Sequence, residues 1–598
     1  MDRHGVCRIG CASMPTLNWM GKEKVVNHHR EVPYRVLERV PEKGVLDSYG
    51  SDCGNMVIHG DNLEALKALL PEYEGKVDCI YIDPPYNTGN EGWVYNDNVN
   101  DPRIRKWLGQ VVGKEGEDFC RHDKWLCMMY PRLQLLRKLL APTGAIFISI
   151  DDNELFNLKL ICDEIFSPSC FVADISWQRT LTKRNDSKGV PSETEHLLLY
   201  SKTSDWVPNR LKRTEGMDSG YSSPDGDPRP WTSVTCSAPG ASTHQGMVYA
   251  IQHPITGGWM YPPVGRCWSL GQDRMLAEMN KWSPYELRNL YDADRRREVC
   301  SGAEVDDSLC GIALVDDSTE ALEKAKARYD RGSRGEQPWP TFFFTSKGKG
   351  GMRTKKYLEE SSGRVATNFW PAGEVGTTDG AKRLLARIFE GSAPFDTPKP
   401  PELIERCIQL ACGDGALVLD SFAGSGTTAH AVLKLNREDG GSRRFILAEL
   451  DDYADTVTAE RVRRVISGYG EGNGAVEGID SGFSYCELGT ALFREDGAID
   501  PAVTHADLAR YVWATETRAP YEDLADEHPY LLGEHAQAVY YLAWEPGEET
   551  TLTYELLREL PRKGSPTVIY ADRCAIAPER LDEMGIVFKR VPDQIARI

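Results

Sequence analysis

The sequence has no apolar run that approaches the ~20 residues needed to cross a bilayer. The N-terminal stretch, MDRHGVCRIGCASMPTLNW, also lacks the apolar core of a signal peptide. We therefore expect a cytoplasmic protein that makes no membrane contact. With 598 residues, of which 41% are hydrophobic and 27% charged, the chain has the composition of a soluble globular protein with several domains.

The 16 cysteines lack the spacing that metal sites show. They are scattered, none falls as C-x-x-C, and the closest pair, Cys7 and Cys11, has no histidine pair near it at metal spacing. In a chain of this length, buried reduced thiols are the expected state. We predict neither a metal site nor disulfides.

Positive charge is in deficit, because the formal net charge is −20. A nucleic-acid-binding surface should be basic, although a local basic groove can lie on an acidic body. Any single basic cluster can be an ordinary solvated face. The clusters lie at Arg179–Arg184, Arg210–Arg213, Arg295–Arg297 and Lys347–Lys356.

Val77–Ile82 (VDCIYI) is a short, mostly apolar run that predicts a buried strand ending at Asp83. Pro84 and Pro85 follow, and they fix the backbone because proline restricts φ and donates no N–H. A carboxylate, the rigid Pro84 carbonyl and the ring of Tyr86 suit a planar base with an exocyclic amine. A strand end followed by a Pro-Pro turn is the alternative, and only a second site can decide between them.

That second site lies far downstream, at residues 416–429 (ALVLDSFAGSGTTA). Gly424, Gly426 and Ala429 fit the G-x-G-x-x-G/A spacing that follows a strand and opens a helix. A second strand, Phe445–Glu449, ends on an acid 25 positions after Gly424, near the spacing of a ribose-binding carboxylate. The order of these elements predicts a nucleoside cofactor.

Together, DPPY at Asp83–Tyr86 and FAGSGTT at Phe422–Thr428 resemble the amino-group DNA methyltransferases that use S-adenosyl-L-methionine. In this family the first motif holds a flipped base and the second holds the cofactor. The order of the motifs is the permuted one called the β class, in which a target-recognition region lies between them. Asn18–Lys22 also resembles the NWxGK segment of Mod subunits of type III restriction–modification systems.

The resemblance implies a set of site residues. Asp61 and Asn62 would contact the adenosine, although Asp61 could instead cap a helix. Lys399 and Pro400 would close over the methionine end. The residues expected to hold the base are Asp83, Pro84, Pro85 and Tyr86, and those expected to hold the cofactor are Asp61, Asn62, Asp396, Lys399, Pro400, Asp420, Phe422, Ala423, Gly424, Ser425, Gly426, Thr427, Thr428 and Glu449.

The implied fold is α/β, a Rossmann-like methyltransferase sheet in circularly permuted order with two additional domains. We expect an N-terminal arm at 1–50 and a catalytic domain at 51–205 and 381–468. A target-recognition region would occupy 206–380. By resemblance to Mod proteins, a small α+β domain at 479–598 would help to assemble a homodimer.

The implied activity is transfer of a methyl group to adenine N6 in duplex DNA after base flipping. The alternatives are a cytosine-N4 DNA methyltransferase, a solitary regulatory or phage-defence methyltransferase, an RNA or protein methyltransferase, and a non-catalytic DNA-binding module. The sequence shows no helicase or nuclease pattern, so restriction would need a separate helicase or nuclease subunit or other defence proteins.

Overall fold

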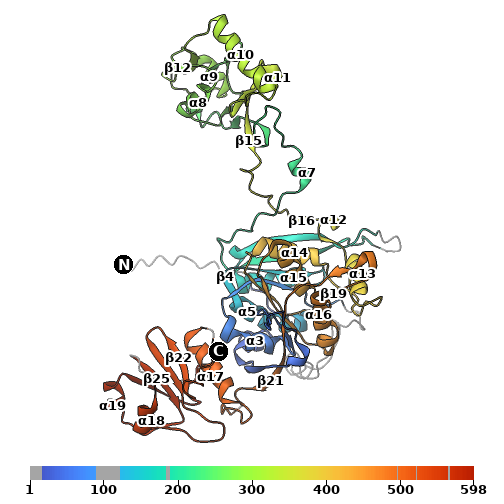
Figure 1. Cartoon of the computed structure of the whole chain (residues 1–598), viewed down its shortest axis with the longest axis vertical. Coiled ribbons are helices and arrows are strands. Elements are labelled where there is room, and N and C mark those ends of the chain that lie inside the picture. The colour runs from blue at the N-terminus through green and yellow to red at the C-terminus, as the bar shows by residue number, and fades with distance from the viewer. Residues whose placement is uncertain are drawn as a thin grey trace, which may run out of the picture. The chain divides into compact units, whose positions relative to one another are not determined.

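A computed structural model describes residues 16–88, 121–182, 189–494, 496–519, 521–562 and 566–597. The chain forms two compact units, one of Met1–Asn209 with Ala366–Ile598 and one of Arg210–Val365 (Figure 1). Within these described ranges, no helix is both long enough and apolar enough to cross a membrane.

The first unit is built on a ten-stranded sheet, here the main sheet, with the order β1-β21-β2-β18-β17-β3-β4-β6-β5-β16. The strands from β21 to β4 run parallel, whereas β6 is antiparallel to its neighbours β4 and β5. This confirms the predicted α/β Rossmann-like fold. The strands are β1 (Arg35–Arg39), β2 (Met56–His59), β3 (Val77–Ile82), β4 (Leu140–Ile150), β5 (Phe171–Gln178), β6 (Thr194–Ser201), β16 (Phe369–Trp370), β17 (Leu417–Asp420), β18 (Arg444–Glu449) and β21 (Ser484–Ala491).

The chain order of the central strands is permuted. β3 pairs directly with β17, so Ile80 lies opposite Leu419 although the two strands are far apart in sequence. The Asp78 carboxylate also accepts a hydrogen bond from the Leu417 backbone N–H at 2.9 Å. The two predicted motifs therefore follow neighbouring parallel strands and leave the main sheet at one edge, which we call the carboxyl edge.

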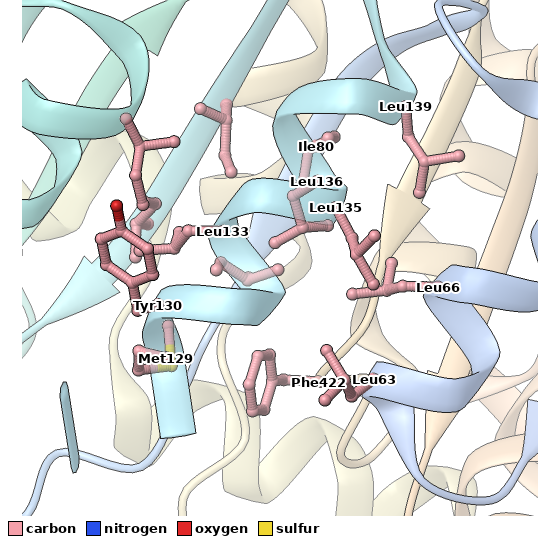
Figure 2. Close-up of a cluster of buried hydrophobic side chains, with 14 of the residues drawn as sticks. Leu63, Leu66, Ile80, Met129, Tyr130, Leu133, Leu135, Leu136, Leu139 and Phe422 are labelled. Atoms are coloured by element: carbon pink, nitrogen blue, oxygen red, sulfur yellow. The ribbon is translucent and has the colours of Figure 1, made fainter. Parts of the chain in front are cut away.

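Helices pack on this sheet through their apolar faces. Leu63 and Leu66 of α3 and Leu133 and Leu136 of α5 belong to one buried cluster with Ile80 of β3 (Figure 2). The helices used below are α2 (His28–Glu31), α3 (Asn62–Tyr73), α5 (Arg121–Leu139), α14 (Pro401–Ala411), α15 (Thr427–Asp439), α16 (Glu460–Ser467) and α17 (His505–Thr517).

The observed unit boundaries differ from the sequence boundaries in three places. β1 lies within the expected N-terminal arm, yet it pairs with β21 at the edge of the main sheet. β16 lies within the expected target-recognition region, yet it pairs with β5, so the second unit ends at Val365. β21 lies within the expected C-terminal domain and joins β2. Strand pairing over long sequence distances explains all three differences.

Smaller sheets lie outside the main sheet. In the second unit, β14 (Phe342–Phe344), β15 (Met352–Tyr357) and β7 (Trp231–Thr235) form a sheet packed by aromatic side chains. After β21, the chain forms a four-stranded sheet of β22 (Leu531–His535), β23 (Ala538–Leu542), β25 (Thr567–Ala571) and β27 (Ile586–Arg590). Neither sheet contributes a residue to the carboxyl-edge cavity described next.

Candidate active site

A small cavity lies at the carboxyl edge, where β3 and β17 end. Ligand sites of open α/β sheets form at this edge. The cavity volume is about 20 Å³, which is room for about one water. Its lining joins the two predicted motifs and comprises Tyr81, Asp83, Phe395, Thr397, Pro398, Lys399, Ile404, Asp420, Phe422, Ala423, Gly424, Ser425 and Thr427.

Asp83 is bound by Lys399. The Lys399 Nζ lies 2.7 Å from each Asp83 carboxylate oxygen and 3.7 Å from Oε2 of Glu195. Burial lowers the pKa of Lys399, but Asp83 and Glu195 raise it more, so the net shift is upward and the ammonium stays charged. Lys399 therefore compensates Asp83 and shares Glu195 with Arg179, which lies 3.4 Å from the other Glu195 oxygen.

Tyr86 is held in place by Glu195 and Lys399. Its hydroxyl donates to Glu195 Oε2 at 3.1 Å, and Lys399 Nζ lies 5.0 Å from the centroid of its ring. Burial and then the Asp83 charge raise the pKa of Tyr86, so the phenol remains a neutral donor. The Trp125 indole donates to the Pro85 carbonyl at 2.7 Å. The Pro-Pro segment is thus held in place from α5.

The glycine turn is held by Glu449 at the end of β18. One carboxylate oxygen accepts from the Gly424 backbone N–H at 2.7 Å, and the other accepts from the Leu450 and Asp451 backbones. Gly426 has a φ of +75°, and a Cβ there would lie 2.8 Å from the Thr458 carbonyl oxygen. The turn requires glycine at this position for both reasons. The predicted ribose contact of Glu449 stays a prediction.

Asp420, the last residue of β17, closes the turn from the other side. Its carboxylate accepts from the Phe422 backbone N–H at 3.0 Å and from the Thr428 hydroxyl at 2.5 Å. Burial raises the pKa of Asp420 to about 7, although these two hydrogen bonds oppose the shift. The carboxyl therefore titrates near neutral pH.

A buried arginine supports the turn from behind. Arg461 of α16 donates to the hydroxyls of Ser425, at 2.9 Å, and Thr427, at 2.6 Å. It is fully buried and makes no ion pair with a described residue. Burial lowers its pKa to about 10, which still leaves it charged at neutral pH. The guanidinium thus joins α16 to the first turn of α15.

Asp61 has the capping role that the sequence left open. Its carboxylate accepts from the Leu63 and Glu64 backbones at the start of α3, at 2.8 and 3.3 Å. The next residue, Asn62, donates to the Ser421 carbonyl at 3.0 Å, and Arg132 donates to its Oδ1 at 2.6 Å. These residues connect the segment after β2 with the segment after β17.

The structure places some predicted residues away from the cavity. Asp396 is an example: its carboxylate is 78% exposed and pairs with Lys382 at 2.9 Å, while its neighbours Phe395 and Thr397 line the cavity. The chain turns at this point, so adjacent side chains point to different sides. Predicted residues that do not line the cavity are Asp61, Asn62, Pro84, Pro85, Tyr86, Asp396, Pro400, Gly426, Thr428 and Glu449.

Sequence reasoning missed Glu195, Trp125 and Arg461. One signal could have found Glu195. It stands at the start of a strand that runs antiparallel to the rest, so it lies at the edge where the parallel strands end. The contact from Trp125 depends on a helix that is separated from DPPY in sequence, and it leaves no local pattern.

Comparison with known proteins agrees with this geometry. Residues 77–460, well over half of the chain, match the family model described as DNA methylase. The chain belongs to the DNA methylase family. It is 32% identical over 505 residues to the Mod subunit of the type III restriction-modification enzyme StyLTI of Salmonella typhimurium. That alignment covers 79% of this chain and 66% of the relative.

Two further relatives are covered by this chain to different extents. The type III EcoP15I Mod subunit of Escherichia coli is 28% identical, with 73% of this chain and 64% of the relative covered. The type II methyltransferase M.KpnI of Klebsiella pneumoniae is 31% identical, with 69% of this chain and 84% of the relative covered. The chain therefore spans slightly less than two thirds of the length of the type III relatives and most of M.KpnI.

Proposed function

We propose that this member of the DNA methylase family transfers a methyl group from S-adenosyl-L-methionine to adenine N6 in duplex DNA. The observation that carries the proposal is that Asp83 and the glycine turn line one cavity, beside which Lys399 contacts both Asp83 and the ring of Tyr86. The similarity to type III Mod subunits over most of the chain supports adenine as the target base.

The residues of the turn fit the adenosyl cofactor. Gly424 lines the cavity and adds no side chain there, and Asp420 and Glu449 place carboxylate oxygens on the two sides of the turn. Lys399 brings a buried cation that suits the carboxylate of a methionine group. When bound, S-adenosyl-L-methionine supplies an electrophilic methyl group on a sulfonium centre.

The chain's own residues act on the base. A flipped adenine stacks on the Tyr86 ring, and its amine donates to the Asp83 carboxylate and the Pro84 carbonyl. Bonds to these acceptors raise the electron density on a nitrogen whose lone pair is otherwise delocalised. As the N–C bond forms, the methyl–sulfur bond of the sulfonium would break to leave a neutral thioether. The amine must lose one proton, and Asp83 is the carboxylate placed to accept it. Positioning of the two substrates contributes most of the rate.

For the base to reach Asp83, the ammonium of Lys399 must leave it. Glu195 already lies 3.7 Å from that ammonium and can receive it. The methionine carboxylate offers a second acceptor. The small cavity volume fits this exchange, because the ion pair fills the space between Asp83 and the turn.

We further propose that the second unit reads the target sequence and that the segment after β21 helps to form a homodimer. The duplex DNA partner would meet the basic clusters of the second unit, of which Lys347–Lys356 is one. A restriction subunit or another defence protein would be a separate chain. A cytoplasmic location accords with these partners.

Modification-sensitive sequencing of DNA from cells that express this chain tests the function. We expect N6-methyladenine within one sequence motif in wild-type cells and its loss with Asp83→Ala. Asp205→Ala, at an exposed position, is the matched control and should keep the mark. N4-methylcytosine at the motif would correct the target base. An unmodified genome, with purified protein also inactive on DNA, would contradict the proposal.

A further inference from the structure

A second, larger cavity lies at the opposite edge of the main sheet, which we call the amino edge. Its volume is about 430 Å³, and residues at the end of α3 and at the end of α5 line it. α3 starts after the carboxyl end of β2 and ends before β3, and α5 leads directly into β4. A 12-residue helix is about 18 Å long. This cavity, the amino-edge pocket, is therefore separate from the active site.

Five segments of the chain build the amino-edge pocket. α2 contributes Arg30, the end of α3 contributes Glu74, α5 contributes Lys138, and the end of α17 contributes Arg518. Arg597 completes the ring from the last described segment. α17 contacts α3, and the two helices are neighbours in Figure 1. An ion pair of 2.9 Å between Arg518 and Glu74 joins the two sides.

Positive charge exceeds negative charge in this lining. Four cationic side chains face one carboxylate, Glu74, which is already paired with Arg518. Arg597 donates to the Gly497 carbonyl at 3.2 Å, a neutral acceptor. The structure gives the side chains of Arg30 and Lys138 no hydrogen bond or ion pair with any described residue. This excess stands out in a chain of net charge −20.

Two buried basic groups lie behind the pocket, and the charges of the pocket cations add to the effect of burial on their pKa values. Lys67 is 2% exposed and donates only to the backbone carbonyls of His29 and Arg30. Burial and then the Lys138 charge lower the pKa of Lys67 to about 8. Burial, Lys138 and Arg30 lower the pKa of His29 to about 4. No carboxylate compensates either group, so an anion in the pocket would relieve both.

The remaining walls are apolar. Leu70, Pro71, Ala514 and Ala596 line the pocket beside the cations. The volume is within the usual range of small-molecule sites, ~300–1,000 Å³. A concave pocket of this size admits a small anion with an apolar part, whereas a DNA duplex would contact only its rim.

We propose that the amino-edge pocket binds a nucleoside polyphosphate. Arg30, Lys138 and Arg518 would hold the phosphates, because arginine forks and lysine ammonium groups form charge-assisted bonds with phosphate oxygens. The nucleoside would lie against Leu70 and Pro71. A ligand that contacts α2, α3 and α17 at once would also tie the segment after β21 to the main sheet.

Equilibrium binding to the purified full chain tests the proposal. The probes are ATP and inorganic triphosphate, both measured with saturating S-adenosylhomocysteine, which blocks the nucleoside site proposed at the carboxyl edge. We expect both probes to bind, ATP more tightly. Lys138→Gln and Arg30→Gln should each weaken ATP binding at least tenfold without changing the melting temperature of the protein by more than a few degrees. Lys324→Gln, an exposed lysine of the second unit, is the control and should bind as wild type.

Three results would overturn the proposal: no binding of either probe at millimolar concentration, equal affinity in wild type and both pocket variants, or displacement of triphosphate by a short DNA duplex. The first would mean that the cations only compensate the carbonyl ends of α3, α5 and α17. The last would assign the pocket to the DNA backbone. None of these readouts depends on methyl transfer. A failure of the nucleotide-binding proposal can therefore be distinguished from a failure of the proposed function.

Discussion

Lys399 holds both oxygens of Asp83, with its Nζ 2.7 Å from each. The same ammonium lies 3.7 Å from Glu195, which also pairs with Arg179 at 3.4 Å. This relationship was invisible in the sequence, where 316 positions separate Lys399 from Asp83. It gives the site a pH dependence that can be measured.

Replacing Lys399 with Met should make methyl transfer more sensitive to acid. Without the ammonium, Asp83 loses its ion pair while Glu195 keeps its pair with Arg179, and a carboxylate that loses an opposite charge binds a proton more readily as the pH falls. We expect about a tenfold loss of kcat/KM at pH 6 relative to wild type, and a smaller loss at pH 8.5. Lys399→Arg keeps the charge and should keep the wild-type profile. Superimposed profiles for wild type and Lys399→Met would refute this role.

Asp420 should make the protein less stable as the pH rises from about 4 to about 7. Its pKa is about 7 in the folded protein and near 3.8 in the unfolded chain, so the folded state binds more protons within that window. The difference corresponds to at most about 4 kcal/mol. Asp420→Asn removes this titration. The free energy of unfolding, measured with urea at pH 5 and pH 8, should differ less between the two pH values in the variant than in the wild type. The same difference in both proteins would contradict the assignment.

Gly426→Ala should impair folding and cofactor binding more than Gly440→Ala. The two glycines have nearly the same φ, +75° and +74°, but a Cβ at 426 meets the Thr458 carbonyl at 2.8 Å and one at 440 meets nothing within 4 Å. We expect a cost of about 1–2 kcal/mol at position 440 from backbone strain alone. At position 426 the close contact should add about 1–3 kcal/mol. Thermal melts measure the stability of the two variants, and S-adenosylhomocysteine binding measures their cofactor affinity. Equal losses in Gly426→Ala and Gly440→Ala would exclude the steric explanation.

Arg461→Met should weaken cofactor binding through the glycine turn. The substitution keeps the apolar volume and removes the hydrogen bonds to Ser425 and Thr427, which should cost about 1–3 kcal/mol of stability. S-adenosylhomocysteine affinity should fall about tenfold. Arg461→Lys keeps the charge and should show an intermediate loss. A stability loss with unchanged affinity would limit Arg461 to a structural role.

The sequence predicted the parts of the fold that have a local signature. The strand at Val77–Ile82 has the predicted limits, and β18 begins one residue earlier than predicted. Buried parallel strands are continuous apolar runs, so such segments can be recognised directly. The family and the α/β fold followed from the two motifs and are confirmed.

What could not be predicted depends on pairing between distant segments. β5 has a mostly half-buried pattern near the sheet edge, so it was not recognised as a strand. The contacts that Glu195 makes with Tyr86 and Lys399 depend on packing across the carboxyl edge. Asp396 was predicted as a cofactor-binding residue by resemblance to the family, yet its side chain points to solvent. Sequence position alone does not fix the direction of a side chain in a turn.

The permuted strand order also affects synthesis on the ribosome. β3 emerges early, but its neighbour β17 emerges more than 300 residues later, and β21 must still insert between β1 and β2. A nascent chain that stops before residue 417 therefore exposes an apolar strand edge of β3. Such a chain needs protection from aggregation until translation has passed Ala491. For this protein, a premature stop codon before residue 417 should yield an insoluble product, not a smaller enzyme.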